Sequence, residues 1–270
     1  MHPERNDFLA VAIEAAKLAG RIILDNLGSI SKEDISIKQT SDFVTSADKE
    51  SETAIISTIK KNFPDHHFLA EESVKEIATD GYRWIIDPLD GTTNFIHRYP
   101  VFSVSIALQY KREIILGIIY EPLKDDLFAA QKGRGAFLNG DVIRVSQTTT
   151  LKDSLITTGF PFRRKEFIDS YLGLFRNIFL RVSDLRRAGS AALDLAYLAC
   201  GRCEGFFEIG LSPWDMAAGD LLIREAGGVV TDFRGGSEYL STGNIVAGVP
   251  GVHSELLEEV RKVFAGILDK

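Results

Sequence analysis

The chain has 270 residues, of which 45% are hydrophobic and 26% are charged, and its formal net charge is -7. This size and apolar content suit a folded chain with a sizeable core, in one large domain or two modest ones, and the negative charge argues against the whole chain wrapping nucleic acid. No run approaches the roughly 20 apolar residues of a membrane-spanning helix, and the first residues lack the order of a signal peptide, so a cytoplasmic protein is predicted.

The first half of the chain is predicted to combine two helices with a sheet. Apolar residues recur at helical spacing over residues 7–27, and a second helix is expected from Ser46 to Asn62, where Pro64 stops it. Runs rich in Ile, Val, Leu, Phe and Tyr then follow at 83–87, 102–110, 113–121 and 125–131. Asn139-Gly140 is a typical hairpin turn, so the sheet should have antiparallel character.

The second half is predicted to form an α/β-like lobe, because short strands alternate with helices. The expected strands are 155–159, 205–209, 228–232 and 244–248, and the expected helices are 165–179, 189–199, 214–226 and 252–266. The polar stretch from Ser146 to Thr150 is the best boundary, which divides the chain into lobes 1–147 and 148–270. No long linker separates the two lobes, so they are expected to pack as one unit.

A short apolar segment, Trp84 to Ile86, runs directly into Asp87 and Asp90, which stand three positions apart. Carboxylates held close together repel each other, and each raises the pKa of the other. A divalent cation removes this conflict, and Mg²⁺ prefers a few carboxylate oxygens together with water and phosphate. Both aspartates are therefore predicted magnesium ligands. The alternative is an ordinary Asp90-Gly91 turn with Asp87 as a helix cap.

A short helix is expected to open at Gly91-Thr92-Thr93, and its N-terminal amides would supply a local positive field for a phosphate group. Other acidic residues occupy comparable positions. Glu71 and Glu72 follow the apolar segment 68–70, and Asp215 lies in the first turn of an apolar helix. Asp48 follows Thr45 at the spacing of a capping box. Capping alone would explain both Asp48 and Asp215.

Two cysteines, Cys200 and Cys203, have the C-x-x-C spacing of thioredoxin-like redox sites. They follow an apolar helical stretch, so they lie near a helix C-terminus, where the helix dipole disfavours a thiolate. Neither a second Cys pair nor a spaced His pair completes a zinc site. Two small, largely buried thiols are the favoured interpretation, with redox chemistry as the alternative.

Two long motifs and several short ones resemble those of the inositol monophosphatases, which belong to the lithium-sensitive, magnesium-dependent sugar-phosphate phosphatases. The long motifs are Trp84-x-x-Asp87-Pro88-Leu89-Asp90-Gly91-Thr92-Thr93-Asn94-Phe95-Ile96-His97, and Trp214-Asp215-Met216-Ala217-Ala218-Gly219 continuing to Glu225-Ala226-Gly227-Gly228. The short ones are Asp42-Phe43-Val44-Thr45 with Asp48, Glu71-Glu72, and Gly189-Ser190-Ala191-Ala192. The resemblance extends over nearly the whole chain.

The resemblance implies an α+β fold of alternating helix and sheet layers (α-β-α-β-α), usually a homodimer, with two to three Mg²⁺ ions per site. Glu71, Asp87 and the carbonyl group of Leu89 should hold the first ion; Asp87, Asp90 and Asp215 the second; and Glu71 with waters a weaker third. Thr92 and Asp48, with Glu71, should form the catalytic group that orients or deprotonates water. The backbone amides of Gly91 and Thr92 should bind phosphate, while Asp90, Ala191, Glu208 and Asp215 face the alcohol, beside Gly189 and Ser190.

The function implied is hydrolysis of inositol monophosphates by in-line attack of a metal-activated water, without a covalent intermediate. Fructose 1,6-bisphosphate and other sugar or nucleotide phosphates are alternative substrates. A haloacid-dehalogenase phosphatase would form a phospho-aspartate, but that class uses D-x-D, and Asp87 and Asp90 are one residue too far apart for it.

A non-enzymatic role is the other alternative. Arg163-Arg164-Lys165 and Arg186-Arg187 are basic clusters that could contact RNA or a protein partner, as some bacterial relatives of this family are thought to do. They could equally meet the second phosphate of a bisphosphate substrate, since guanidinium groups suit phosphate. Short charge runs are usually only solvated surface.

Overall fold

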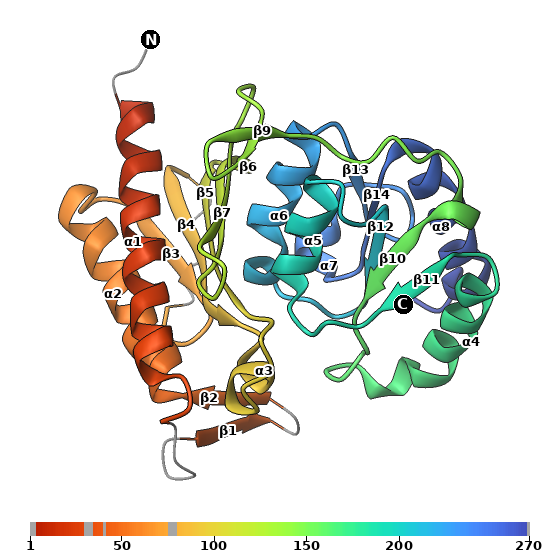
Figure 1. The fold of residues 1–270 in the computed structure, drawn as a ribbon, viewed down its shortest axis with the longest axis horizontal. Coiled ribbons are helices and arrows are strands. Elements are labelled where there is room, and N and C mark those ends of the chain that lie inside the picture. Colours follow the sequence, from red (N-terminus) through yellow and green to blue (C-terminus); the bar gives the residue numbers. More distant parts are fainter. Residues whose placement is uncertain (1–3, 30–34, 40–41, 75–79, 269–270) are drawn as a thin grey trace.

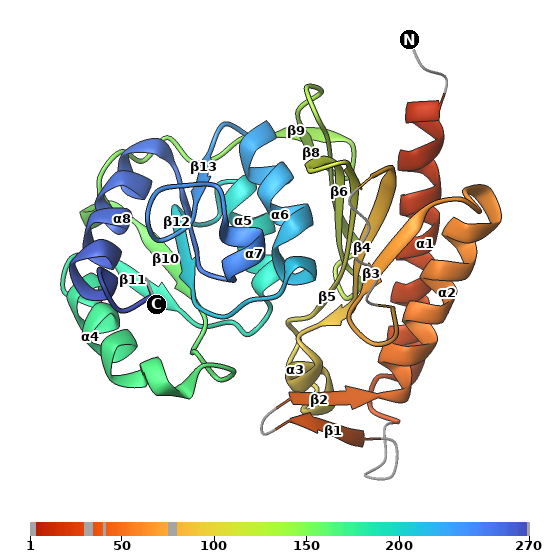
Figure 2. The ribbon, with the colours of Figure 1, turned by 180° about the vertical axis from the view of Figure 1, so that it is seen from behind.

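Helices and sheets alternate in α-β-α-β-α order across the molecule (Figure 1). The computed structural model describes residues 4–29, 35–39, 42–74 and 80–268. Helices α1 and α2 cover the outer face of a seven-stranded sheet, α5 and α6 lie between this sheet and a five-stranded one, and α4 and α8 cover the far side (Figures 1 and 2). The layered α+β architecture predicted from the sequence is confirmed.

The outer helical layer consists of α1 (Glu4–Asn26) and α2 (Ser46–Asn62). Small residues of α1, including Ala12, Ala15 and Ala19, are fully buried, and they allow α2 and strands of the sheet to approach closely. Helix α2 begins and ends where the sequence predicted, and α1 begins three residues earlier than the predicted start at residue 7.

The seven-stranded sheet has the order β3-β4-β5-β6-β7-β8-β9. Its strands are β3 (His67–Ala70), β4 (Tyr82–Asp90), β5 (Ser103–Tyr110), β6 (Glu113–Glu121), β7 (Asp126–Gln131), β8 (Ala136–Leu138) and β9 (Asp141–Ile143). All neighbouring pairs are antiparallel except β3 and β4, which are parallel. Because parallel strands end at the same edge, the residues that follow β3 lie beside the end of β4.

The hairpin between β8 and β9 turns at Asn139 and Gly140, whose φ angles of 52° and 92° are both positive, as a tight two-residue hairpin turn requires. A small antiparallel pair, β1 (Ile35–Gln39) and β2 (Asp42–Thr45), and the short helix α3 (Thr92–Ile96) lie together at one end of the sheet (Figure 1). The β1–β2 pair was not predicted from the sequence.

The five-stranded sheet has the order β11-β10-β12-β14-β13. Its strands are β10 (Leu155–Thr158), β11 (Asp184–Arg186), β12 (Gly205–Glu208), β13 (Val229–Thr231) and β14 (Ile245–Gly248). Strands β11, β10 and β12 are parallel, whereas β12, β14 and β13 are antiparallel. The lobe is therefore only partly α/β-like, because only the β11-β10-β12 part of this sheet is parallel.

The helices of this half are α4 (Ile168–Phe179), α5 (Ala191–Ala199), α6 (Pro213–Glu225), α7 (Tyr239–Thr242) and α8 (Pro250–Phe264), with 3-10 turns at Leu151–Asp153 and Lys165–Phe167. The predicted helix 165–179 thus begins as a 3-10 turn. Strand β11 and helix α7 were not predicted, since each has only three or four residues.

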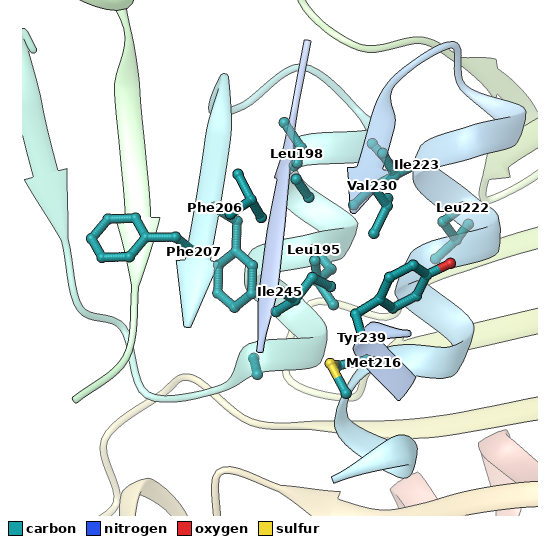
Figure 3. Packing of buried hydrophobic residues seen from close by; sticks show 14 of the residues in the cluster. Leu195, Leu198, Phe206, Phe207, Met216, Leu222, Ile223, Val230, Tyr239 and Ile245 are labelled. Carbon is teal, nitrogen blue, oxygen red and sulfur yellow. The ribbon is translucent and has the colours of Figure 1, made fainter. Parts of the chain in front are cut away.

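A hydrophobic core lies between α5, α6 and the five-stranded sheet, where Leu195, Leu198, Phe206, Met216 and Leu222 are fully buried (Figure 3). Helix α6 also packs against strands β5, β6 and β7. Gly117 of β6 permits this contact, because a Cβ atom there would lie 2.7 Å from the carbonyl oxygen of Ala218. A division of the chain at residue 147 remains a prediction.

Cys203 is a buried thiol, and Cys200 is partly buried. Cys200 follows the last residue of α5 and Cys203 is 1% exposed. Burial raises the pKa of both thiols, which opposes thiolate formation. This agrees with the favoured interpretation and gives no support to redox chemistry.

Candidate active site

The end of β4 is distorted where the two predicted ligands lie. Asp87 pairs with Ser105 and Asp90 with Ser103, so the strand bulges at the two residues between them. Pro88 has no N–H group to give to the sheet, which favours such a bulge. Asp87 is 1% exposed, and one of its oxygens accepts a hydrogen bond of 3.0 Å from the backbone N–H of Leu89. The carboxylate is therefore held in a fixed position.

The turn after β4 requires glycine. Gly91 has a φ of 96°, and a Cβ atom there would lie 2.9 Å from the carbonyl oxygen of Val101. Nearby, the side-chain amide of Asn94 donates to the carbonyl groups of Val101 and Ala188, at 2.8 and 2.9 Å. Asn94 thus links the segment before α5 to the turn after β4 through hydrogen bonds, although Asn94 and Ala188 are 94 positions apart in the chain.

Asp90 is held by the N-terminus of α5. Its Oδ2 atom accepts hydrogen bonds from the hydroxyl group of Ser190 at 2.5 Å and from the backbone N–H of Ala192 at 2.8 Å. Donors at a helix start stabilise a carboxylate. Burial nevertheless raises the pKa of Asp90 to about 7, and the nearby charge of Asp215 adds to the shift.

Asp215 comes from the first turn of α6, where it forms a capping box with Ser212, whose backbone N–H donates to Oδ2 at 2.6 Å. Ligand atoms of Asp87, Asp90 and Asp215 all lie within 4.8 Å of one another. Burial raises the pKa of all three carboxyl groups, and their mutual repulsion raises the pKa of Asp87 further. A divalent cation would relieve this repulsion, and these hard oxygen donors fit Mg²⁺.

Glu71 follows β3 and lines the same cavity as the three aspartates. The parallel pairing of Ala70 with Ile86 places it there, and its backbone N–H donates to Ile86 at 3.1 Å. Buried Glu52 of α2 supports the following residues by accepting hydrogen bonds from the backbone of Glu72, at 2.7 Å, and from the Ser73 hydroxyl group.

Thr92 and Asp48 are also brought together. The Thr92 hydroxyl group lies 3.0 Å from Oδ1 of Asp48 and 3.1 Å from the carbonyl oxygen of Leu89. The other oxygen of Asp48 accepts from the backbone N–H of Thr45 at 2.8 Å, in the predicted capping box. Burial raises the pKa of Asp48 to about 6. Asp48 therefore caps α2 and also faces the site.

These residues surround one cavity of about 360 Å³. Every site residue predicted from the sequence lines it except Asp48, which contacts it through Thr92: Glu71, Asp87, Leu89, Asp90, Gly91, Thr92, Gly189, Ser190, Ala191, Glu208 and Asp215. Glu208 is buried at the end of β12, and burial together with nearby Asp194 raises the pKa of its carboxyl group. The roles assigned to these residues remain predictions.

Several residues of the cavity were missed or interpreted differently from the sequence, among them Asp194, Gly159 and Arg163. Asp194, 3% exposed, lies among the apolar residues of α5, and an acidic residue inside such a run was the signal that could have identified it. Gly159 lines the cavity beside Glu208. Arg163, considered above as part of a surface cluster, points into the cavity and lies 3.2 Å from Oδ2 of Asp215.

The comparisons with known proteins agree with this geometry. The model of the inositol monophosphatase family matches residues 4–265. Nus factor SuhB from Escherichia coli strain K12 is 47% identical over 271 residues, and the match covers 100% of both chains. The structure of extragenic suppressor protein suhB from Bartonella henselae is 44% identical with a TM-score of 0.91, covering 95% of this chain and 99% of that one. The inositol monophosphatase from Anabaena is 41% identical with a TM-score of 0.86, covering 96% of each chain. The chain belongs to the inositol monophosphatase family.

Proposed function

We propose that the protein is a magnesium-dependent phosphomonoesterase that hydrolyses inositol monophosphates to inositol and phosphate. Family membership supports a metal-dependent phosphatase. The observation that carries the proposal is the convergence of Asp87, Asp90 and Asp215 within 4.8 Å, from a strand and a helix more than a hundred positions apart in the chain. The name of the Anabaena structure, an inositol monophosphatase, favours inositol monophosphate as the substrate.

The proposed cation ligands are Glu71, Asp87, the carbonyl group of Leu89, Asp90 and Asp215, for two to three Mg²⁺ ions. When bound, Mg²⁺ neutralises the phosphate charge, lowers the pKa of water and stabilises the departing alkoxide. A phosphate monoester otherwise resists attack because both reactants are anionic. The buried carboxylates of this cavity would supply the negative charge that retains the ions.

The remaining residues would act on water and substrate. Thr92 would orient the attacking water, while Asp48, 3.0 Å from its hydroxyl group, would accept the proton through it. The backbone amides of Gly91 and Thr92 would donate to the phosphate oxygens. Asp90, Asp215, Glu208 and Ala191 would face the hydroxyl groups of the alcohol, with Gly189 and Ser190 forming the adjacent wall; these residues all line the cavity.

A substrate panel with a magnesium titration tests the proposal. Inositol monophosphate, fructose 1,6-bisphosphate and 3'-phosphoadenosine 5'-phosphate would be assayed side by side, with and without Li⁺, on wild-type protein and on Asp90→Asn. We expect highest kcat/KM on inositol monophosphate, inhibition by Li⁺ and a loss of several orders of magnitude in Asp90→Asn while it stays folded. Near-normal turnover of this variant at saturating Mg²⁺, or a phospho-aspartate trapped at Asp87, would contradict the mechanism.

A bisphosphate remains the second substrate class, because two arginines, Arg163 and Arg187, line the cavity. Guanidinium groups bind phosphate through paired hydrogen bonds. A kcat/KM higher on fructose 1,6-bisphosphate than on inositol monophosphate, and lost in Arg187→Gln, would favour it.

A role in transcription is the second candidate function, because a relative 47% identical over its whole length is called a Nus factor. The exposed basic clusters are less positive than the sequence indicates: Arg164 pairs with Glu166 at 2.6 Å, and Arg186 pairs with Asp184. A salt-sensitive shift of RNA by the catalytically inactive Asp215→Asn variant would support direct RNA binding. In its absence the role would need a protein partner.

We also propose a homodimer that forms through α4. Ile168, Leu172 and Phe179 are 39%, 47% and 55% exposed and lie at helical spacing with Phe175, which stacks against Phe179. The opposite face of α4, with Tyr171, Leu174 and Ile178, is fully buried in the core. A helix that is apolar on two faces needs a second partner, and a contiguous exposed apolar patch is typical of an interface.

Among the described residues, no helix is long and apolar enough to cross a membrane.

A further inference from the structure

Arg163 lies between two of the proposed metal ligands. Its Nη1 atom is 3.2 Å from Oδ2 of Asp215, and its Nη2 atom is 3.9 Å from Oε1 of Glu71. The two acids come from different layers, since Glu71 follows β3 and Asp215 belongs to α6. The arginine side chain is 25% exposed, and the carboxylates are 11% and 7% exposed. A single guanidinium group thus bridges acids that would otherwise repel each other across the cavity.

From this geometry we propose that Arg163 is a built-in counter-ion that occupies part of the cation site before metal binds, and that it lowers the affinity of the site for divalent cations. The proposal rests on the proposed metal-dependent function. It assigns the arginine a role in setting metal affinity, in place of the surface contact considered for the basic cluster.

The physical basis is competition for the same oxygen. Oδ2 of Asp215 already accepts from the backbone of Ser212 at 2.6 Å and from Arg163. An Mg²⁺ ion needs its oxygen ligands at about 2.1 Å in a near-octahedral arrangement, which leaves no place for a positively charged guanidinium group on the same atom. Arginine stays protonated at any physiological pH, so it cannot lose its charge and must move.

The segment that carries Arg163 is suited to such a movement. It lies between β10 and the 3-10 turn at Lys165–Phe167, outside any helix or strand. Its neighbour Phe162, also at the cavity, is partly exposed, and the guanidinium group lies 4.9 Å from the centre of that ring. The guanidinium group thus contacts two carboxylates and one ring, and a divalent cation would compete with it for the carboxylates.

Metal binding without substrate tests the proposal. Free Mn²⁺ would be measured by electron paramagnetic resonance during titration of wild-type protein, Arg163→Gln and Arg163→Lys. The matched control is Arg164→Gln, which removes the neighbouring arginine that pairs with Glu166 on the surface. We expect Arg163→Gln to bind Mn²⁺ roughly threefold to tenfold more tightly, the range for loss of a partly exposed ion pair. Arg163→Lys should lie between, and Arg164→Gln should match wild type.

Thermal unfolding supplies the second measurement. In EDTA, Arg163→Gln should have a lower Tm than wild type, because its acids lose their counter-ion, whereas at saturating Mg²⁺ the two proteins should unfold together. Unchanged or weaker Mn²⁺ binding in Arg163→Gln would overturn the proposal and show that the arginine instead positions Asp215 for the metal or does not affect it. If wild type and variant both failed to bind Mn²⁺, the metal site itself would be refuted.

Discussion

The hydroxyl group of Thr92 lies 3.0 Å from Oδ1 of Asp48, which joins the start of α3 to the start of α2 across the edge of the seven-stranded sheet. The same carboxylate caps α2 through its other oxygen. A helix cap and a candidate proton acceptor are therefore one side chain. The two roles that the sequence allowed for Asp48, helix capping and catalysis, do not exclude each other, because a carboxylate has two oxygens.

Removal of the charge of Asp48 should affect catalysis more than folding. In Asp48→Asn one acceptor remains, but the side chain can no longer take a proton, so we expect kcat to fall by about 100-fold to 10,000-fold, the range for a positioned acid or base. Stability should change by no more than about 1 kcal/mol, as for a helix cap. Steady-state assays at saturating Mg²⁺ and urea unfolding measure the two effects.

Thr92 supplies the matched pair of variants. Thr92→Ser keeps the hydroxyl group and should retain most activity, whereas Thr92→Val keeps the shape and loses the hydroxyl group. A Thr92→Val protein with the kcat of wild type would contradict a role for this hydroxyl group in orienting water.

The buried carboxyl groups predict how stability of the metal-free protein depends on pH. Folding raises the pKa of Asp48 to about 6 and that of Asp90 to about 7, from a model-peptide value of about 3.8. Between pH about 4 and about 7, the folded chain therefore binds more protons than the unfolded chain. The free energy of unfolding contributed by these groups decreases as the pH rises through this range. Urea unfolding in EDTA at a series of pH values measures this slope.

The titration of His253 changes the free energy of unfolding in the opposite direction, so its contribution must be separated from that of the carboxyl groups. It is buried, hydrogen-bonded to Thr231, and burial lowers its pKa to about 4 from 6.5, so it contributes stability that increases with pH across that window. Asp90→Asn leaves His253 unchanged, so the difference between this variant and wild type reports the acidic cluster: loss of the Asp90 carboxylate together with its effect on neighbours such as Asp87. Added Mg²⁺ should raise Tm more at pH 8 than at pH 5, because it binds the ionised acids. An equal Tm increase at both pH values would argue against a carboxylate metal site.

Gly159 is expected to control the position of Glu208. A Cβ atom on Gly159 would lie 2.0 Å from Oε1 of Glu208, so Gly159→Ala must displace this carboxyl group from the cavity wall. If Glu208 faces the alcohol, KM for inositol monophosphate should rise roughly tenfold, in line with about one lost hydrogen bond to a polar group. Hydrolysis of p-nitrophenyl phosphate, whose alcohol lacks those hydroxyl groups, should change little.

The control is Gly173→Ala in α4, where a Cβ atom would meet nothing within 4 Å. It should leave both substrates unaffected. Equal losses on the two substrates in Gly159→Ala would indicate a general distortion of the site and would remove the basis for placing the alcohol beside Glu208.

The long elements of the fold could be predicted because their periodicity reflects burial. Helix α2 buries residues at helical spacing, such as Ile55 and Ile59, and strands β5 and β6 are buried over most of their length, as their apolar runs indicated. The Asn139-Gly140 turn follows from backbone sterics. The pairing of β3 with β4 could not be predicted. Parallel strands are not joined by a tight hairpin turn, so no local sequence pattern shows that these two strands are neighbours. That pairing is what places Glu71 beside Asp87.

The candidate site was predictable from motifs, but its interior contacts were not. The paired acids at the end of β4 are visible as a local conflict between an apolar strand and negative charge. The inward direction of the Arg163 side chain could not be predicted, because a run of basic residues has the same sequence pattern whether it faces water or a buried acid. His253 illustrates a related limit: a single histidine on an amphipathic helix carries no sign of whether it will be buried, as it is here at 5% exposure.

Ser190 should hold Asp90 in place as well as capping α5. Its hydroxyl group donates to Asp90 at 2.5 Å and accepts from the backbone N–H of Leu193 at 3.4 Å. Ser190→Ala removes both contacts, so we expect a loss of about 1 kcal/mol in stability and weaker Mn²⁺ binding. Ser190→Gly preserves most of the capping preference and should be more stable than Ser190→Ala, yet equally impaired in metal binding. Recovery of metal binding in Ser190→Gly would show that only the cap matters.

The exposed face of α4 predicts an oligomer that surface charge should dissociate. Phe179 is 55% exposed and stacks on Phe175, with ring centres 6.4 Å apart and planes inclined by 6°. Burial of such rings against a second copy would remove a large apolar area from water, whereas a charged residue in the same place would be left desolvated. Phe179→Glu combined with Leu172→Lys should therefore convert a dimer of wild-type protein to a monomer in light scattering coupled to size-exclusion chromatography.

Val142→Glu is the matched control for this pair, since Val142 is 63% exposed on β9, an edge strand of the seven-stranded sheet, whereas α4 covers the far side of the five-stranded sheet. It should leave the dimer intact. Wild-type protein that is monomeric at all concentrations, or a dimer that persists in the α4 variant, would place the interface elsewhere or remove it. Because α4 connects the segment that carries Arg163 to β11, activity of the monomeric variant at saturating Mg²⁺ would show whether the site depends on the partner subunit.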